Sequence, residues 1–138
     1  MRTRVQNNKE QIFCEWRHRW VRLTPEEWIR QQLLHRMVSE GGYPASLIAV
    51  EQAITVGDVH KRCDAVVYDS AMQALMLIEC KAETVPLTQK TLDQAITYNR
   101  KLNVPYLLLS NGAQTICIDG NNNYSSGFPR YTDLLRCK

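Results

Sequence analysis

Apolar residues recur with a helical period in two segments of the chain. The first segment begins at Thr24, because threonine is a favourable N-cap, Pro25 suits the first helical position and Glu27 can complete a capping box. Gly41 and Gly42 indicate where this helix ends. The stripe predicts an amphipathic helix, and its apolar members are Trp28, Ile29, Leu33, Leu34 and Met37.

The second helical segment extends over residues 86–105, where Pro105 ends the pattern. Its polar side carries Lys90, Asp93, Thr97, Arg100 and Lys101. The opposite face is broad and mostly apolar, which predicts that the helix packs on a core through Leu92, Ala95, Ile96, Asn99 and Leu102.

Short apolar runs between turn residues predict five strands. Three of them, at 46–56, 63–69 and 74–82, follow one another with short turns and indicate a meander of hairpins. The run at 105–112 is wholly apolar, as expected for a strand buried on both faces, and 114–119 follows it. The order α-β-β-β-α-β-β predicts an α/β fold, in which a mixed β-sheet is flanked by helices.

The ends of the chain have weaker patterns. Residues 1–11 are polar, and we expect a flexible N-terminus that precedes a single domain over 12–138. Residues 13–23 could form a strand or an extended lead-in. The asparagine-rich segment 120–129 has the composition of a loop, and 130–138 suggests a short terminal helix.

Composition restricts the class of protein. The 138 residues are 44% hydrophobic and 22% charged, which is typical of a soluble globular domain. The longest apolar run, Ala74 to Ile78, is far too short to span a bilayer, and no apolar stretch follows the basic N-terminus. We therefore expect a cytoplasmic protein with no membrane contact.

The five cysteines are odd in number, and no two have the C-x-x-C spacing. This pattern argues against a disulfide framework and against a zinc site, so we expect reduced thiols.

The net charge of +3 is a mild bias, but basic residues gather in three clusters, at 14–22, 60–62 and 99–101. Such clusters can contact phosphates, or they can form an ordinary solvated surface. Sequence alone leaves both interpretations open.

Charged residues end the most hydrophobic strand. Glu79 and Lys81 lie two apart, so their side chains should project from one face. A hairpin around 69–74 would bring Asp64, at the start of the preceding strand, close to both. Two adjacent carboxylates favour a divalent cation such as Mg²⁺, which suits metal-assisted phosphoryl transfer. The alternative is a surface ion pair, with Asp64 capping a turn.

Two polar residues of the second helix share a face with each other. Gln94 and Tyr98 are spaced i, i+4 and could point along the sheet towards the same charged residues. The alternative is a core tyrosine beside an ordinary boundary glutamine.

The segments 61–69, 75–82 and 92–112 resemble the N-terminal domain of type I restriction enzyme R subunits, within the PD-(D/E)XK nuclease superfamily. The segment 22–51 is also similar, so the resemblance covers roughly residues 12–118. It implies a restriction-endonuclease-like core and a nuclease-like domain over 12–138 that cuts DNA with Mg²⁺ or Mn²⁺. It also implies a RecB-type Gln-x-x-x-Tyr motif.

The resemblance assigns roles to particular residues. Asp64 and Glu79, with the carbonyl of Cys80, correspond to the metal ligands. Lys81 corresponds to the lysine that assists the attacking water, and Gln94 and Tyr98 to residues that orient this lysine and the DNA backbone. A further acid is expected from Glu27, less so from Glu26, or from Glu51. Expected contacts with nucleic acid come from Lys61, Arg62, Arg100 and Lys101.

The chain departs from the family pattern in two ways. Cys63 stands where the motif has proline. No G-x-x-x-x-G-K-[ST] sequence is present, so we expect a solitary domain or part of a split system. Expected partners are a separate helicase/ATPase or specificity subunit, or a second copy in a homodimer. The alternative function is a catalytically silent module for nucleic-acid binding or assembly in a restriction or repair system.

Overall fold

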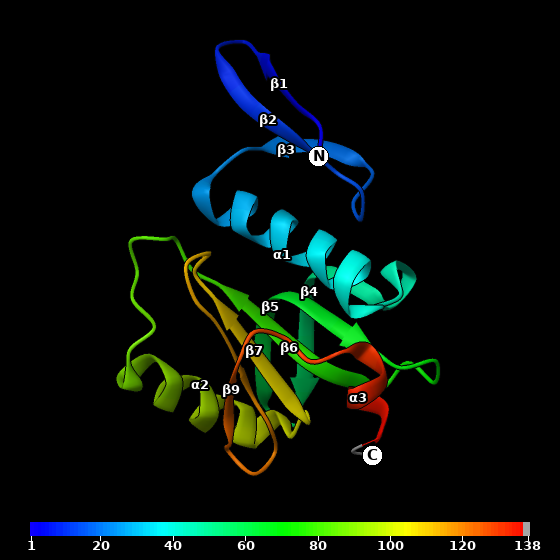
Figure 1. Ribbon diagram of the computed structural model, residues 1–138, viewed down its shortest axis with the longest axis vertical. Helices are drawn as coiled ribbons and strands as arrows, with labels where there is room; N and C mark the ends of the chain where they lie inside the picture. The colour runs from blue at the N-terminus through cyan, green and yellow to red at the C-terminus, as the bar shows by residue number, and fades with distance from the viewer. Residues whose placement is uncertain (137–138) are drawn as a thin grey trace.

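A computed structural model describes residues 1–136 of the chain, as two sheets separated by a helix (Figure 1). The larger sheet has six strands and the smaller, N-terminal sheet has three. The smaller sheet comprises β1 (Thr3–Gln6), β2 (Lys9–Cys14) and β3 (Arg19–Arg22). The remaining elements are α1 (Pro25–Gly41), η1 (Ala45–Leu47), β4 (Ile48–Val56), β5 (Val59–Tyr68), β6 (Ala74–Cys80), α2 (Gln89–Leu102), β7 (Tyr106–Ser110), β8 (Thr115–Ile118), β9 (Tyr124–Ser126) and α3 (Tyr131–Arg136).

The six-stranded sheet has the order β4-β5-β6-β7-β8-β9. Its first three strands form the predicted antiparallel meander, and β6 then pairs with β7 in parallel. Parallel neighbours need a long crossover, and α2 provides it. The predicted order α-β-β-β-α-β-β and the mixed sheet are therefore confirmed, with β1, β2 and β3 before them and β9 and α3 after them.

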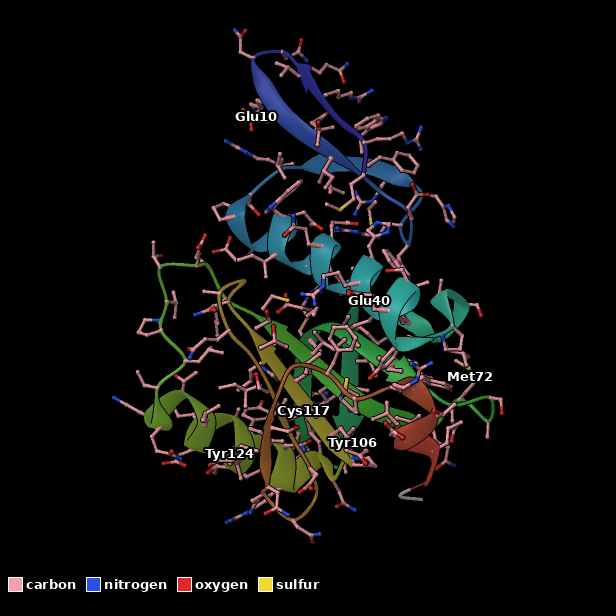
Figure 2. All side chains as sticks on the ribbon, viewed as in Figure 1. Glu10, Glu40, Met72, Tyr106, Cys117 and Tyr124 are labelled. Atoms are coloured by element: carbon pink, nitrogen blue, oxygen red, sulfur yellow. The ribbon has the colours of Figure 1, made fainter. Side chains whose placement is uncertain are left out.

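Each face of the larger sheet has its own core. One core forms where α1 packs through Ile29, Leu33, Leu34 and Met37, and the other where α2 packs through Leu92, Ile96 and Leu102. All five residues of β7 are buried, as its apolar sequence predicts. Tyr106 and Cys117 lie inside this assembly, whereas Met72 lies at the exposed turn between β5 and β6 (Figure 2).

The first helix begins and ends where the sequence predicts. The side chain of Thr24 accepts a hydrogen bond from the Glu27 N–H at 3.1 Å, and Gly42 adopts a left-handed φ of 72°. Two details of the predicted helix are wrong. The Glu27 side chain binds arginines and does not complete the capping box with Thr24. Trp28, predicted on the apolar stripe, remains 39% exposed because it lies at the margin of the buried side.

The second helix is shorter than predicted at its start. The side chain of Thr88 accepts a hydrogen bond from the Thr91 N–H, so the helix begins at Gln89 and Pro86 lies in the preceding loop. Asn103 ends it with a left-handed φ of 55°.

Residues 1–11, for which the sequence predicts a flexible N-terminus, contain β1 and the start of β2, and these two strands form a hairpin. Its two-residue turn, Asn7-Asn8, has φ of 53° and 63°, which asparagine tolerates and which suits a tight hairpin. Strand β3 then pairs with β2, so the lead-in expected at 13–23 contains two strand segments and a turn. Polar composition was misleading because one side of this small sheet faces solvent.

The C-terminal part also contains more structure than a loop. The carboxylate of Asp119 accepts hydrogen bonds from the N–H groups of Asn121 and Asn123, and this tight turn leads into β9. The expected terminal helix is present as α3, while residues 137 and 138 lie outside the described part of the chain. Within residues 1–136, no helix is long and apolar enough to cross a membrane.

The described cysteines, Cys14, Cys63, Cys80 and Cys117, are free and buried, as expected for reduced thiols. Cys137 lies outside the described residues.

Substitution of Leu108 tests the importance of β7 for the two-layered packing. Leu108 is 0% exposed, so Leu108→Ala should lower the free energy of unfolding by about 2 to 5 kcal/mol, because it leaves a cavity in the core. Urea denaturation measures the change. Leu135→Ala, at a leucine that is 40% exposed, is the matched control and should have a much smaller effect. Equal effects would contradict the proposed core.

Candidate functional site

The end of β6 brings a carboxylate from the neighbouring strand against its backbone. Ala65 of β5 is opposite Ile78 of β6, so one further step in register places Asp64 beside Glu79. Instead of a ladder bond, Asp64 Oδ2 accepts a hydrogen bond from the Cys80 N–H at 2.6 Å. The backbones of Asp64 and Glu79 are therefore neighbours at one end of the β5–β6 pair.

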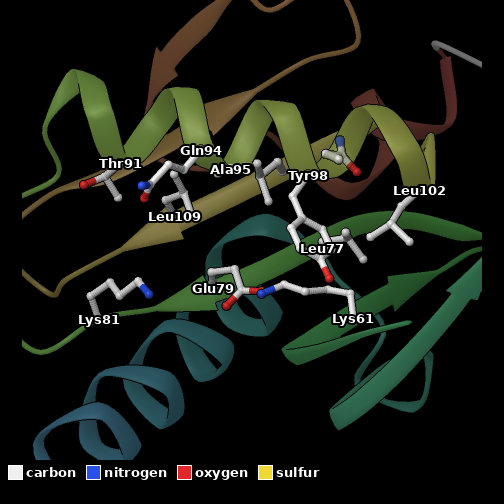
Figure 3. A pocket seen from close by; sticks show the side chains of 12 residues that line it. Lys61, Leu77, Glu79, Lys81, Thr91, Gln94, Ala95, Tyr98, Leu102 and Leu109 are labelled. Carbon is white, nitrogen blue, oxygen red and sulfur yellow. The ribbon is translucent and has the colours of Figure 1, made fainter. Parts of the chain in front are cut away.

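Four of the predicted catalytic residues line one cavity. Glu79 and Lys81 reach it from the end of β6, and Gln94 and Tyr98 reach it from α2 (Figure 3). The cavity measures about 190 Å³, and its apolar floor includes Leu77, Leu107 and Leu109. Asp64 is not among the lining residues, because its side chain is turned towards the Cys80 amide and α1.

The cation that pairs with Glu79 is Lys61. The Lys61 Nζ atom lies 3.0 Å from Glu79 Oε1 and 5.2 Å from the centre of the Tyr98 ring (Figure 3). Tyr98 is fixed in turn, since its hydroxyl donates to the carbonyl of His60 at 3.0 Å. Lys61 was expected only as a contact for nucleic acid. Its place beside Glu79 became visible only in the structure, because β5 begins as early as Val59.

Lys81 has a different environment. It is exposed, its N–H donates to the Ser110 carbonyl at 2.8 Å, and no ion pair within residues 1–136 engages its ammonium. The surface ion pair between Glu79 and Lys81, which was the alternative interpretation of the sequence, is therefore absent from the described residues. The backbone bond to β7 nevertheless fixes the position from which Lys81 reaches the cavity.

The surroundings of Glu79 favour the neutral form of its carboxyl more than water does. Burial raises the pKa of the Glu79 carboxyl, and the charge of Asp64 adds to this, while Lys61 and, less strongly, Lys81 lower it. The net pKa is raised. The pKa of Lys61 is also raised: burial opposes this, but the hydrogen bond and charge of Glu79 outweigh it.

Asp64 is bound on its other side by α1. Arg30 Nη1 lies 3.6 Å from Asp64 Oδ1 and donates to the Asp64 carbonyl at 3.4 Å. The same guanidinium contacts both Glu27 and Glu51. Arg30 is thus shared between the candidate site and a group of buried charges.

That group includes an arginine from the small sheet. Arg17, in the turn between β2 and β3, reaches Glu27 at 2.6 Å and Glu51 at 2.7 Å. Gln31 donates to the second oxygen of Glu27 at 2.9 Å. Burial raises the pKa of Glu27, but the bonds from Arg30, Arg17 and Gln31 more than compensate, so the net pKa is lowered.

Glu51 occupies an irregularity in the sheet. Its φ of 55° is left-handed, and the regular β4–β5 pairing omits it between Val50 and Gln52. The side chain binds Arg17 and, at 3.2 Å, Arg62. Glu27 and Glu51, the expected additional acids, thus connect to Asp64 through Arg30. Glu26, the less favoured candidate, is exposed.

The remaining expected contacts for nucleic acid lie apart from one another. Arg62 is held by Glu51, whereas Arg100 and Lys101 are exposed in the last turn of α2.

Sequence reasoning missed Arg17 and Arg30. Only the spacing of Glu27 and Arg30, one turn apart on a buried side, could have indicated the second of them.

The residues present suit a hard divalent ion with few protein ligands. Within residues 1–136, no group of three or more His, Cys, Asp or Glu side chains could hold a metal ion together. An ion at the end of β6 would therefore depend on Asp64, Glu79 and backbone oxygen. Glu79 Oε1 is buried, and the Lys61 ammonium lies 3.0 Å from it. Magnesium commonly takes one or two carboxylates and keeps its waters, so this donor set fits.

A model of the family described as "type I restriction enzyme R protein N terminus" matches residues 25–132. The chain belongs to this family. The match includes all of the predicted site residues, from Glu26 and Glu27 to Tyr98 and Lys101. The resemblance inferred from the motifs is thereby confirmed. A comparison with curated protein sequences finds no match.

Solved structures with the same fold agree with this family. A fragment assigned to the HsdR subunit of a type I restriction enzyme from Vibrio vulnificus has a TM-score of 0.64 and 18% identity, over 82% of this chain and 25% of that one. A protein from Anabaena variabilis assigned as a nuclease has a TM-score of 0.50 and 10% identity, over 88% of this chain and 78% of that one. This family member therefore has a nuclease-like fold and spans about a quarter of the HsdR chain.

Substitution of Glu27 tests the buried charges of this family member. Glu27→Gln should lower the free energy of unfolding at pH 7 by about 3 kcal/mol, because it removes the more buried of the two acids that Arg17 and Arg30 share, the other being Glu51. The folded-state pKa of Glu27 is lowered, so its stabilisation is present above its ordinary value of 4.5 and is lost as pH falls towards the folded pKa. The difference between the proteins should therefore shrink in urea titrations at acidic pH. Glu26→Gln is the control and should be nearly neutral; a cost equal to that of Glu27→Gln would contradict the network.

Titration of Glu79 tests which lysine is its partner. Lys61→Ala should raise the pKa of Glu79 further, because it removes the 3.0 Å ion pair, and Lys81→Ala should raise it less. The carboxyl ¹³C shift of Glu79, followed by NMR across pH, measures both. A larger rise in the Lys81 variant would show that the pairing is wrong.

Proposed function

We propose that this domain is a metal-dependent nuclease of the PD-(D/E)XK type that hydrolyses phosphodiester bonds of DNA with Mg²⁺ or Mn²⁺. One observation carries the proposal. Glu79 and Lys81 share a cavity with Gln94 and Tyr98, and the Cys80 amide holds Asp64 at the same end of the strand. Acidic, basic and amide groups from the end of β6 and from α2 thus line one cavity, and the Asp64 carboxylate of β5 is bound at the same strand end.

Asp64, Glu79 and the carbonyl of Cys80 would hold the ion. A bound Mg²⁺ stabilises negative charge on a phosphate and lowers the pKa of a bound water. The raised pKa of Glu79 supports this assignment. Desolvation and the charge of Asp64 make the ionised Glu79 carboxylate unfavourable unless a cation lies beside it, and Lys61 is that cation in this structure.

The protein groups around the ion have separate tasks in this proposal. Lys81, which has no acidic partner in the described chain, orients the attacking water and stabilises charge on the phosphate. Gln94 positions Lys81 and the DNA backbone. Tyr98 supports that end of the cavity, because the His60 carbonyl fixes its hydroxyl. Arg30 keeps the Asp64 carboxylate directed to the end of the strand.

The substrate and partners are also proposals. The domain acts on DNA, with Arg100 and Lys101 as exposed contacts for phosphates beside α2. It functions in the cytoplasm as a restriction-type domain. A separate helicase/ATPase or specificity subunit brings it to its target, or two copies act together to cut both strands.

A specific observation favours a second candidate, a catalytically silent module for nucleic-acid binding or assembly. Each candidate carboxylate ligand already has a cation: Lys61 beside Glu79 and Arg30 beside Asp64. If these pairs persist with Mg²⁺ present, the domain retains the fold and loses turnover.

Cleavage of plasmid DNA separates the two candidates. The wild-type protein should nick or linearise DNA with Mg²⁺ or Mn²⁺ and should be inactive with EDTA. Lys81→Ala should reduce the rate by at least about 10²-fold, because it removes the group that assists the water. Lys90→Ala, at an exposed lysine of α2, is the matched control and should leave the rate unchanged. Full activity of the Lys81 variant would reject the mechanism, and no metal-dependent cleavage by the wild type would favour the silent module.

A further inference from the structure

The small N-terminal sheet has one buried side and one open side. Ile12 and Cys14 of β2 are 0% exposed and face α1, where Gln31 contacts the Cys14 thiol. Because side chains alternate along a strand, Phe13 of β2 faces away from α1, as does Trp20, its direct partner in β3. Figure 1 shows this sheet on the side of α1 opposite the six-stranded sheet. Its open side is thus a surface separate from the cavity between β6 and α2.

The charges on the open side are all positive. The register aligns Arg4 of β1, Gln11 of β2 and Arg22 of β3 in one row, and it places Lys9 opposite Gln6. Glu10, the acidic residue of these strands, projects to the other side. We refer to this open side as the basic sheet face, made of Arg2, Arg4, Lys9, Phe13, Trp20 and Arg22.

No ion pair within residues 1–136 neutralises these four basic side chains, in contrast to the arginines around Glu27. All four are exposed. Their positive charge is therefore available to an external anion.

Aromatic rings hold two of the guanidinium groups in place. The Arg2 guanidinium lies 4.1 Å from the centre of the Phe13 ring, and that of Arg4 lies 4.2 Å from the Trp20 ring. The two rings support each other edge to face at 5.5 Å. Arg4 also donates one hydrogen bond, at 2.7 Å, to Gln11. Stacked arginines lose less freedom when they bind an anion, and their other N–H groups remain available to solvent.

The spacing of these charges suits an extended polyanion. Arg4 and Arg22 are separated by one strand, or about 10 Å across the sheet. A face with four exposed basic side chains and no acidic one complements a phosphate backbone better than a hydrophobic partner.

We propose that the basic sheet face binds the phosphate backbone of duplex DNA without sequence preference, as an anchoring surface apart from the cavity. The choice of DNA as the polymer rests on the proposed function; the anionic chemistry rests on the face alone.

Binding measured without divalent metal tests this surface independently of hydrolysis. Fluorescence anisotropy of a labelled 30-base-pair duplex in EDTA would be followed from 0.05 to 0.2 M salt. Arg4→Gln/Arg22→Gln should weaken binding at 0.1 M salt by at least about tenfold and should reduce the slope of log K against log salt by about 1.8, because two phosphate contacts are lost.

A matched double variant controls for charge and folding. Arg19 lies in the same strand as Arg22 but opposite Cys14, on the other side of the sheet, and Arg130 is exposed far along the chain. Arg19→Gln/Arg130→Gln removes the same charge and should change binding by less than about twofold. Both double variants should unfold at the wild-type urea concentration, because exposed substitutions have small effects on stability.

Several results would overturn the proposal. An equal loss of DNA affinity in the two double variants would do so, as would no measurable binding by the wild type. Equally tight binding of polyglutamate would also do so, and would assign the face to an acidic protein. DNA binding through the face without cleavage in Mg²⁺ would reject the proposed nuclease alone. Cleavage with unchanged binding in the Arg4/Arg22 variant would reject the face alone.

Discussion

The hydrogen bond between the Cys80 N–H and Asp64 Oδ2 determines how the candidate site is built. It lies just beyond the last regular pair of β5 and β6, where a sheet would otherwise separate. The side chain of Asp64 replaces a backbone acceptor there, so its carboxylate is fixed at the end of β6. The residue before Cys80 in that strand, Glu79, is also acidic. The parallel pairing of β6 with β7 holds the other side of this end, and α2 follows from the same topology because it makes the crossover.

A second level of organisation comes from buried charge. Two guanidinium groups, from Arg17 and Arg30, lie between Glu27, Glu51 and Asp64, and they join the small sheet, α1 and the larger sheet. Such an arrangement contributes little net stability compared with apolar packing, but it is costly to disrupt in part. Its effect is to fix the relative positions of three elements that share little hydrophobic surface at this point.

Hydrophobic periodicity and turn residues predicted the helices and strands that are specified by short segments of sequence. The stripes of both helices, the meander and the buried β7 follow from periodicity, and the proximity of Asp64 to Glu79 follows from one hairpin. The β1–β2 hairpin was missed because its open side is polar, so composition resembled that of a flexible end. Arg17 could not be found because its partner Glu51 lies 34 residues away, with no repeating pattern to connect them. Lys61 displaced Lys81 as the partner of Glu79 because strand length, which fixes how far side chains reach, is poorly specified by sequence.

The position of Arg17 has a consequence for where this domain can be divided. The segment that matches the family begins at residue 25, after the small sheet has ended. A fragment cut at that boundary keeps every family motif yet removes Arg17 from Glu27 and uncovers the side of α1 that Ile12 and Cys14 protect. Homology boundaries and folding boundaries therefore differ here by more than twenty residues.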